Sequence, residues 1–343
     1  MRCVICGAES TEGGQYCSRC GAIIAEPIRS DDPRLVGAKE DLRKAIGSRQ
    51  STDVIIEPLW AIVPLILTIV GAITGFVITL SRFQSVRDYS SWTAADSLSS
   101  MRDFFLTLVI FSIASATILA IITYRLVKRR NQHFSREQGV RMALVKLIKS
   151  AAWSRERYDS VFPELRIMDQ DSDLQPSRDP LAWSLAIAIS SVSIIGILPI
   201  FLVSDPEAQI GVIVLAIVLT ALVGLVSSIL MFYMFYWLGK DFKEHDTRWN
   251  AVRSYASNAM SKLGVSSPTT SRHGNSQLPE RSFILYLLVT LFFSPFVYYW
   301  WYTLIKDPNE HFRAQWKFED ELLASIADKR RPLTPFISKT SVQ

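Results

Sequence analysis

The 343-residue sequence has only four cysteines, and all of them lie within the first twenty residues. The rest of the chain therefore has no thiol for a disulfide, which fits a reducing compartment and metal thiolates. The long apolar segments contain no Asp, Glu or Lys. Ion and proton pathways usually need such groups, so their absence argues against a transporter or channel. Walker-loop, Gly-x-Ser-x-Gly and His-Glu-x-x-His motifs are also absent, which removes the signatures of common hydrolases.

Long apolar runs dominate what is present. They cover residues 58–80, 104–126, 181–203, 209–238 and 283–305. A run of roughly 18 or more apolar residues is long enough to cross the hydrocarbon core of a bilayer as a helix. The sequence therefore predicts an all-α polytopic membrane protein of about five transmembrane helices, with the lipid bilayer as its first partner.

Basic residues indicate the orientation. Lys128-Arg129-Arg130 follows the second run, and more Lys and Arg follow the fourth. The positive-inside rule then places the amino terminus and the 127–180 and 239–281 loops in the cytoplasm, which predicts a multi-pass protein of the cell membrane. A hinge at Pro295 would make 283–305 a re-entrant hairpin with a cytoplasmic tail. Its 23 residues are enough for one crossing and too few for two, so we expect a single crossing.

The cysteines form two Cys-x2-Cys pairs, each followed by glycine, and they are Cys3, Cys6, Cys17 and Cys20. Two such pairs can complete a tetrahedral four-sulfur shell around one ion. Cys17-Ser18-Arg19-Cys20-Gly21-Ala22 resembles the ending of the short zinc ribbons at the start of many archaeal and bacterial proteins. The resemblance covers residues 3 to about 24. It implies a small β fold held by one structural Zn²⁺, because a complete shell leaves no open position for substrate. A catalytic or redox-sensing use is the alternative.

A second motif, Tyr-x3-Lys-x4-His, occurs three times and indicates an internal duplication. Its copies are Tyr124, Lys128 and His133; Tyr236, Lys240 and His245; and Tyr302, Lys306 and His311. On a helix the Tyr and Lys share a face, whereas the His lies about 140° away. One copy alone therefore cannot bring its three side chains together as a catalytic triad.

Three interpretations of this motif remain open. Tyr124, Tyr236 and Tyr302 with their lysines are typical of anchors at the membrane–water interface. His133, His245 and His311 would suit zinc, copper or iron if the three copies pack around one axis, which requires a cytoplasmic tail. Lys128, Lys240 and Lys306 would suit a lipid or phosphate headgroup.

The repeats also resemble a family of uncharacterised prokaryotic membrane domains. The likeness rests on the aromatic run Tyr298-Tyr299-Trp300-Trp301-Tyr302, the lysine after it, and Asp307-Pro308-Asn309-Glu310. Such domains are fused to zinc ribbons in several architectures. The resemblance implies this architecture and no known activity.

The resulting division of the chain has eight parts. They are a zinc ribbon (1–24), a tether with an amphipathic helix (25–57), a first membrane repeat (58–153), a charged linker (154–180), a second repeat (181–263), a flexible linker (264–281), a partial third repeat (282–329) and a tail (330–343). Within the first repeat, Gly71 and Gly75 are four apart and favour close helix packing.

We expect a non-enzymatic function, that of a membrane-anchored interaction or regulatory scaffold whose ribbon and cytoplasmic helices recruit a cytosolic protein. Nucleic acid is a weaker choice of partner, because Arg2 and Arg19 are the only basic residues of the ribbon. A homo-oligomer is a further option. The alternatives are a small-solute or ion transporter and, third, a membrane metalloenzyme that uses the histidine trio.

Overall fold

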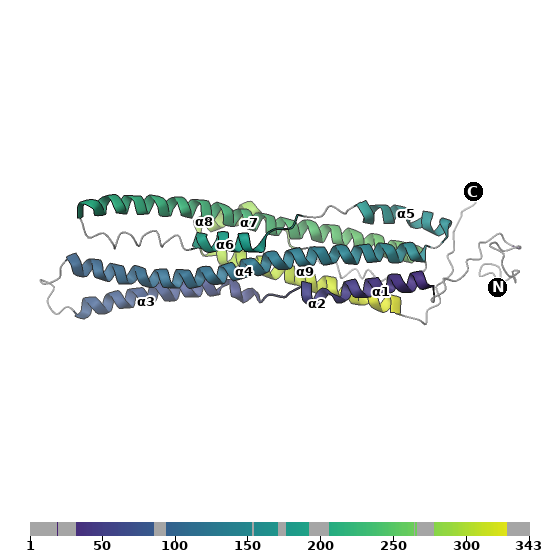
Figure 1. Ribbon diagram of the computed structural model, residues 1–343, viewed down its shortest axis with the longest axis horizontal. Coiled ribbons are helices and arrows are strands. Elements are labelled where there is room, and N and C mark those ends of the chain that lie inside the picture. The colour runs from purple at the N-terminus through teal and green to yellow at the C-terminus, as the bar shows by residue number, and fades with distance from the viewer. Residues whose placement is uncertain are drawn as a thin grey trace.

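The computed structural model describes Arg19 and residues 32–85, 94–152, 154–170, 176–191, 206–263, 265 and 278–327. Within them the elements are α1 (Pro33–Gly47), α2 (Arg49–Thr52), η1 (Pro58–Ala61), α3 (Val63–Ser85), α4 (Ala94–Ala151), α5 (Arg155–Gln170), α6 (Pro180–Ser191), α7 (Pro206–Lys262), α8 (Phe283–Phe292) and α9 (Phe296–Ala327). They form an elongated bundle around the long helices α4, α7 and α9 (Figure 1).

The long helices each combine an apolar half with a polar half. The polar segments 127–151 of α4 and 239–262 of α7 continue the helices of the apolar runs before them. At 1.5 Å per residue, the 58 residues of α4 extend for about 87 Å, far more than the roughly 30 Å of a bilayer core. In the described part of the chain, three helical stretches are long and apolar enough to cross a membrane: Pro58–Gln84, Ser99–Ala151 and Val214–Lys262. The polar halves of α4 and α7 therefore extend beyond the bilayer core into water.

Close packing joins α3 to α4, as the two glycines predict. A Cβ added at Gly71 would lie 2.7 Å from Cβ of Phe111, and one at Gly75 would lie 2.8 Å from Cδ2 of Phe104. Only glycine therefore allows the two helices to approach this closely.

Two hydrophobic cores lie at different levels of the bundle. One, between the apolar and polar halves, includes Leu126, Phe235 and Trp301. The other lies farther along the polar halves and joins α1, α4, α5, α7 and α9. In it, Leu35, Ala38, Leu42 and Ile46 form the buried stripe of α1, and this confirms the predicted amphipathic helix. A layer of buried polar side chains separates the two cores.

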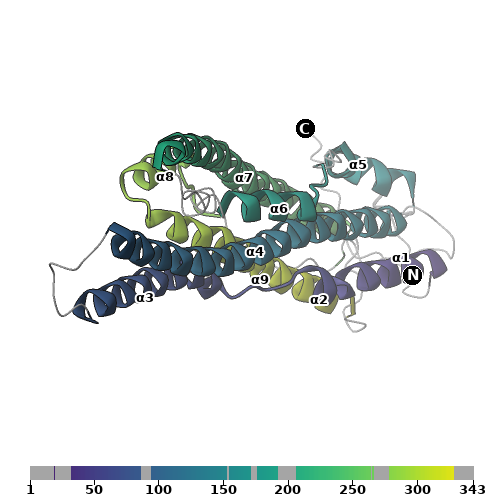
Figure 2. The same cartoon turned by 60° about the vertical axis from the view of Figure 1, so that its left-hand side comes forward.

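The run 283–305 is a helical hairpin, so the prediction of a single crossing was wrong. Helix α8 ends at Phe292, and α9 begins at Phe296 beyond Pro295 (Figure 2). Proline lacks the N–H of a helix and disfavours helical dihedrals in the residue before it, so the run breaks there. Arg281, just before α8, donates to both carboxylate oxygens of Asp307 in α9, at 2.6 and 2.8 Å. The two ends of the hairpin therefore lie next to each other.

A second proline, Pro308, lies inside α9 and interrupts its backbone hydrogen bonding. A proline at this position leaves the carbonyl of Leu304 without its helical N–H partner. The guanidinium of Arg129, from α4, donates to that carbonyl at 3.2 Å and to Oδ1 of Asn309 at 2.7 Å. The amide of Asn309 donates to the carbonyl of Ile56 at 2.7 Å, so this part of α9 is joined both to α4 and to the segment before η1.

The predicted charged linker at 154–180 needs correction, because much of it is helix α5. Val161, Leu165 and Met168 are buried in the second core, and their spacing of three and four residues is that of one helix face. Residues 171–175, which include Asp171 and Asp173, lie outside the described part of the chain, as do residues 192–205, which include the end of the predicted third membrane run.

Candidate metal centre

The three motif histidines come together at one point in the polar layer. His133 comes from α4, His245 from α7 and His311 from α9, and their exposed fractions are 0%, 3% and 2%. The ring centroids form a nearly equilateral triangle with sides of 5.0, 5.2 and 5.3 Å. One ligand nitrogen from each ring lies within 4.8 Å of the others. The repeat thus supplies one imidazole per copy to a shared site that could hold a metal ion.

In the first two copies of the motif the tyrosine and the lysine are exposed, whereas in the third copy Tyr302 and Lys306 are half-buried. The ammonium of Lys128 lies 5.6 Å from the ring centre of Tyr124, and that of Lys240 lies 5.8 Å from the ring centre of Tyr236. Lys306 is half-buried and pairs with a glutamate one turn along its own helix, at 3.6 Å. The structure therefore joins the histidines, whereas each of the three lysines interacts within its own helix.

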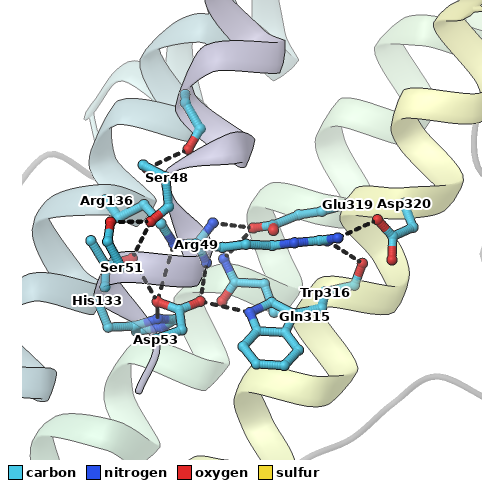
Figure 3. A network of polar contacts seen from close by, with 12 residues as sticks. Ser48, Arg49, Ser51, Asp53, His133, Arg136, Gln315, Trp316, Glu319 and Asp320 are labelled. Atoms are coloured by element: carbon cyan, nitrogen blue, oxygen red, sulfur yellow. Dashed lines mark hydrogen bonds and ion pairs between the residues drawn. The ribbon is translucent and has the colours of Figure 1, made fainter. Parts of the chain in front are cut away.

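Asp53 holds the first imidazole in place. This carboxylate follows α2, and its Oδ1 lies 2.9 Å from Nδ1 of His133 (Figure 3). Arg136 forms an ion pair with Oδ2 at 2.7 Å, and the indole N–H of Trp316 donates to Oδ2 at 2.8 Å. Asp53 is thus fixed by residues of both α4 and α9. Such a carboxylate–histidine pair orients imidazoles that bind metals.

Asp246 does the same for the third imidazole. Its Oδ1 lies 2.7 Å from Nδ1 of His311. Because an ionised carboxylate only accepts hydrogen bonds, Nδ1 of His133 and of His311 must each carry the proton. In the neutral rings, Nε2 then carries a lone pair. Nε2 of His311 is buried and has no hydrogen-bond partner among the described residues, and Nε2 of His133 lies 3.1 Å from Nε2 of His245.

Burial keeps two of the imidazoles neutral, those of His133 and His245. Desolvation lowers the pKa of His133 to about 4, although the hydrogen bond and charge of Asp53 act in the opposite direction. Desolvation also places the pKa of His245 well below its ordinary value. For Asp53, burial would raise the pKa, but the hydrogen bond from His133 and the charge of Arg136 hold it well below its usual range. The site therefore presents neutral imidazoles at His133 and His245 and an ionised carboxylate at Asp53 near neutral pH.

A third carboxylate contacts the site through Arg136 and touches none of the histidines. Glu319 is fully buried, and its Oε1 accepts from Arg136 at 2.7 Å and from the amide of Gln315 at 2.9 Å. Burial raises the pKa of Glu319. Arg136 thus bridges Asp53 and Glu319, and it ties α4 and α9 to the segment after α2 (Figure 3).

The repeated motif predicted the histidines but not the residues that orient them. Asp246 directly follows His245, and this adjacency was the only local signal for it. Asp53 and Glu319 lie 80 and 186 positions from His133, so no spacing could indicate them. The four cysteines of the predicted zinc ribbon lie outside the described residues.

The fold and this site define a helical protein with membrane-length apolar segments and a buried three-histidine cluster. No protein-family model, curated protein or solved structure matches the chain. Its function must therefore be argued from the site itself.

Proposed function

We propose that the protein is a membrane-anchored scaffold braced by a transition-metal ion, which His133, His245 and His311 bind where the helices leave the membrane. The convergence of three buried imidazoles from three helices carries this proposal. Imidazole ligands suit zinc, copper, iron and nickel. The predicted ribbon zinc at the four cysteines would be a second, separate ion.

The distances support a metal site. Ligand nitrogens about 2.0–2.1 Å from a tetrahedral ion lie about 3.3 Å from one another. The His133 and His245 nitrogens are already 3.1 Å apart, and the whole set lies within 4.8 Å. Small side-chain rotations would therefore bring all three to one ion without moving the helices.

The charges support it as well. The carboxylates of Asp53 and Asp246 lie 2.9 and 2.7 Å from Nδ1 of His133 and of His311, so negative charge stands directly behind two of the three imidazoles. Buried charge is costly unless it is compensated. A cation between the imidazoles would help to compensate these carboxylates, alongside Arg136, which pairs with Asp53.

The surroundings favour bracing over catalysis. A catalytic metal keeps an open position for water or substrate. Here the imidazoles are almost fully buried, and hydrophobic cores lie on either side of their layer. An ion at this point would link α4, α7 and α9, and so would fix how the polar halves emerge from the membrane.

The polar halves are the part that a partner would recognise. Lys and Arg are concentrated beside them, so the positive-inside rule favours the cytoplasm for this side and a cell membrane for the apolar half. We propose that these helices, with the predicted amino-terminal zinc ribbon, recruit a cytosolic protein.

Metal analysis of the purified protein tests the centre. The background is Cys3→Ser/Cys6→Ser, which removes the ribbon as a source of zinc. We expect one transition-metal ion per chain in this background, and none after His311→Gln is added. The matched control is His273→Gln, which changes the fourth histidine of the chain and should retain the ion.

Two outcomes would overturn the proposal: a background protein that holds no metal even after addition of Zn²⁺, or an ion that survives His311→Gln. Circular dichroism establishes that the variants are folded. Co²⁺ loading of the background protein gives an independent readout, because nitrogen ligation changes the visible spectrum of the ion.

Chelation tests the bracing role. Removal of the ion should lower the thermal unfolding midpoint of the background protein, because a ligand that binds only the folded state stabilises it. Added Zn²⁺ should restore the midpoint, and His311→Gln should abolish both responses. A midpoint that does not respond to the metal would contradict the bracing role.

A further inference from the structure

A pocket lies at the boundary between the apolar and polar halves, apart from the histidines. We call it the boundary pocket. It is lined by residues between Phe235 and Lys243 of α7, by residues between Leu278 and Phe283, and by the facing sides of α8 and α9, and its volume is about 260 Å³. None of the three histidines lines it. It lies where α7 changes from its apolar run to Lys240 and Lys243.

Aromatic and aliphatic side chains form its inner part. Phe235 and Trp300 are nearly fully buried, with ring centres 4.8 Å apart. Phe283 packs edge-on against Trp300 at 5.5 Å and against Tyr236 at 5.3 Å. Leu304 completes this apolar surface. Such a lining holds hydrocarbon and provides little to hold a polar solute.

Positive charge lies at the rim. Lys240 and Lys243 are three residues apart and therefore share one face of α7. Lys243 pairs with Glu280 at 2.7 Å, and both side chains are exposed, at 51% and 87%. Exposed pairs of this kind contribute little to stability, so this lysine can exchange its partner for a phosphate. Arg281 forms a bidentate ion pair with Asp307, and this pair forms part of one wall of the pocket.

Exposed apolar side chains of α7 and α8 flank the pocket. On α8, Ile284, Leu285 and Leu288 are 68%, 57% and 47% exposed, and on α7 Tyr233 and Tyr236 are 48% and 42% exposed. Apolar surface of this extent is where the bilayer contacts the protein. A molecule dissolved in the membrane can therefore enter the pocket without crossing water, with its polar end at the level of the lysines.

We propose that the boundary pocket binds one anionic phospholipid, with part of an acyl chain against the aromatic inner part and the phosphate between Lys240 and Lys243. Basic residues at the membrane surface attract anionic lipids. A bound lipid would fill the space between α7 and the α8–α9 hairpin, and would hold the hairpin in place from outside.

Gly239 gives a way to block the site. It lines the pocket, and nothing lies within 4 Å of the position that its Cβ would take. Gly239→Phe therefore fills the pocket without a backbone clash. The matched control is Gly224→Phe, on the same helix, where a Cβ also has no neighbour within 4 Å and which is not among the lining residues.

Native mass spectrometry of the detergent-purified protein counts bound lipid after addition of phosphatidylglycerol or phosphatidylcholine. We expect one tightly held phosphatidylglycerol, weakened about tenfold or more in Gly239→Phe and unchanged in Gly224→Phe. Lys240→Glu/Lys243→Glu should weaken phosphatidylglycerol about tenfold and leave phosphatidylcholine unchanged.

Unchanged retention in Gly239→Phe would overturn the site, and equal affinity for the two lipids in the unmodified protein would overturn the anionic headgroup. Metal content and thermal unfolding of each variant report its folding. The variants leave the three histidines and their carboxylates intact, so a failure here is separate from a failure of the metal centre.

Discussion

Replacement of Asp53 gives a direct test of the proposed metal centre. Its carboxylate accepts from Nδ1 of His133 at 2.9 Å and from the indole of Trp316 at 2.8 Å, and it pairs with Arg136 at 2.7 Å. Asparagine has the same shape but only one acceptor oxygen. In Asp53→Asn the amide group must face at least one of these donors, and the negative charge is lost.

Two effects of different size should follow. Loss of a carboxylate that orients a ligand typically lowers metal affinity about 10- to 100-fold, or roughly 1.4–2.7 kcal/mol. Loss of one partner from a buried ion pair costs about 3–5 kcal/mol of stability. Because Arg136 keeps its contact with Glu319 at 2.7 Å, we expect a value near the lower end, about 3 kcal/mol.

Competition for Zn²⁺ with a chromophoric chelator measures the first effect in the Cys3→Ser/Cys6→Ser background, and thermal unfolding in detergent measures the second. Asp320→Asn is the control. Its pair with Arg49 lies at 2.8 Å, but the side chain of Asp320 is 58% exposed, so at most about 1 kcal/mol is expected. The reasoning fails if Asp53→Asn binds zinc as tightly as its parent, or if both variants lose the same stability.

Three further experiments test the fold. Gly71→Leu should separate α3 from α4 and destabilise the protein by about 1–3 kcal/mol in thermal unfolding, because its Cβ would overlap Phe111, whereas Gly224→Leu should change little. Leu42→Ala should cost about 2–5 kcal/mol and make α1 sensitive to limited proteolysis, since Leu42 is fully buried; equal loss in the exposed Val36→Ala would contradict this. In a variant with all four native cysteines changed to serine, Glu310→Cys and Lys240→Cys should react with an impermeant maleimide from the same side of the membrane, and Arg102→Cys from the opposite side. Labelling of Glu310→Cys from the Arg102 side would refute the hairpin.

The sequence predicted well what depends on local periodicity. The α1 stripe, the approach at Gly71 and Gly75, and the exposed tyrosines and lysines of the first two motif copies follow from which residues share a helix face. The convergence of the histidines was one of three interpretations, because the motif gives the direction of a side chain within its helix but does not say whether separate helices meet.

What the sequence could not provide depends on contacts between distant segments. Helix α4 continues through residues 127–135 because the residues on both sides of that stretch pack against other helices. From the sequence, the charged Lys128-Arg129-Arg130 suggested a loop there. The run 154–170 looked like a linker because its apolar residues are few, yet Val161 and Leu165 are buried against other helices. Asp53 lies outside every motif, and its role exists only where α2, α4 and α9 meet.

The polar layer also explains how the bundle selects one alignment. A hydrophobic core alone tolerates sliding of one helix past another, because apolar contacts have little directionality. A slide by one turn, about 5.4 Å, would separate His133 from Asp53 and His311 from Asp246, and would leave buried polar groups without partners. The hairpin break at Pro295 is what returns α9 to this layer. The third histidine, both carboxylate contacts and the alignment of the helices therefore depend on the same turn, and a metal ion would add its binding energy to that single arrangement.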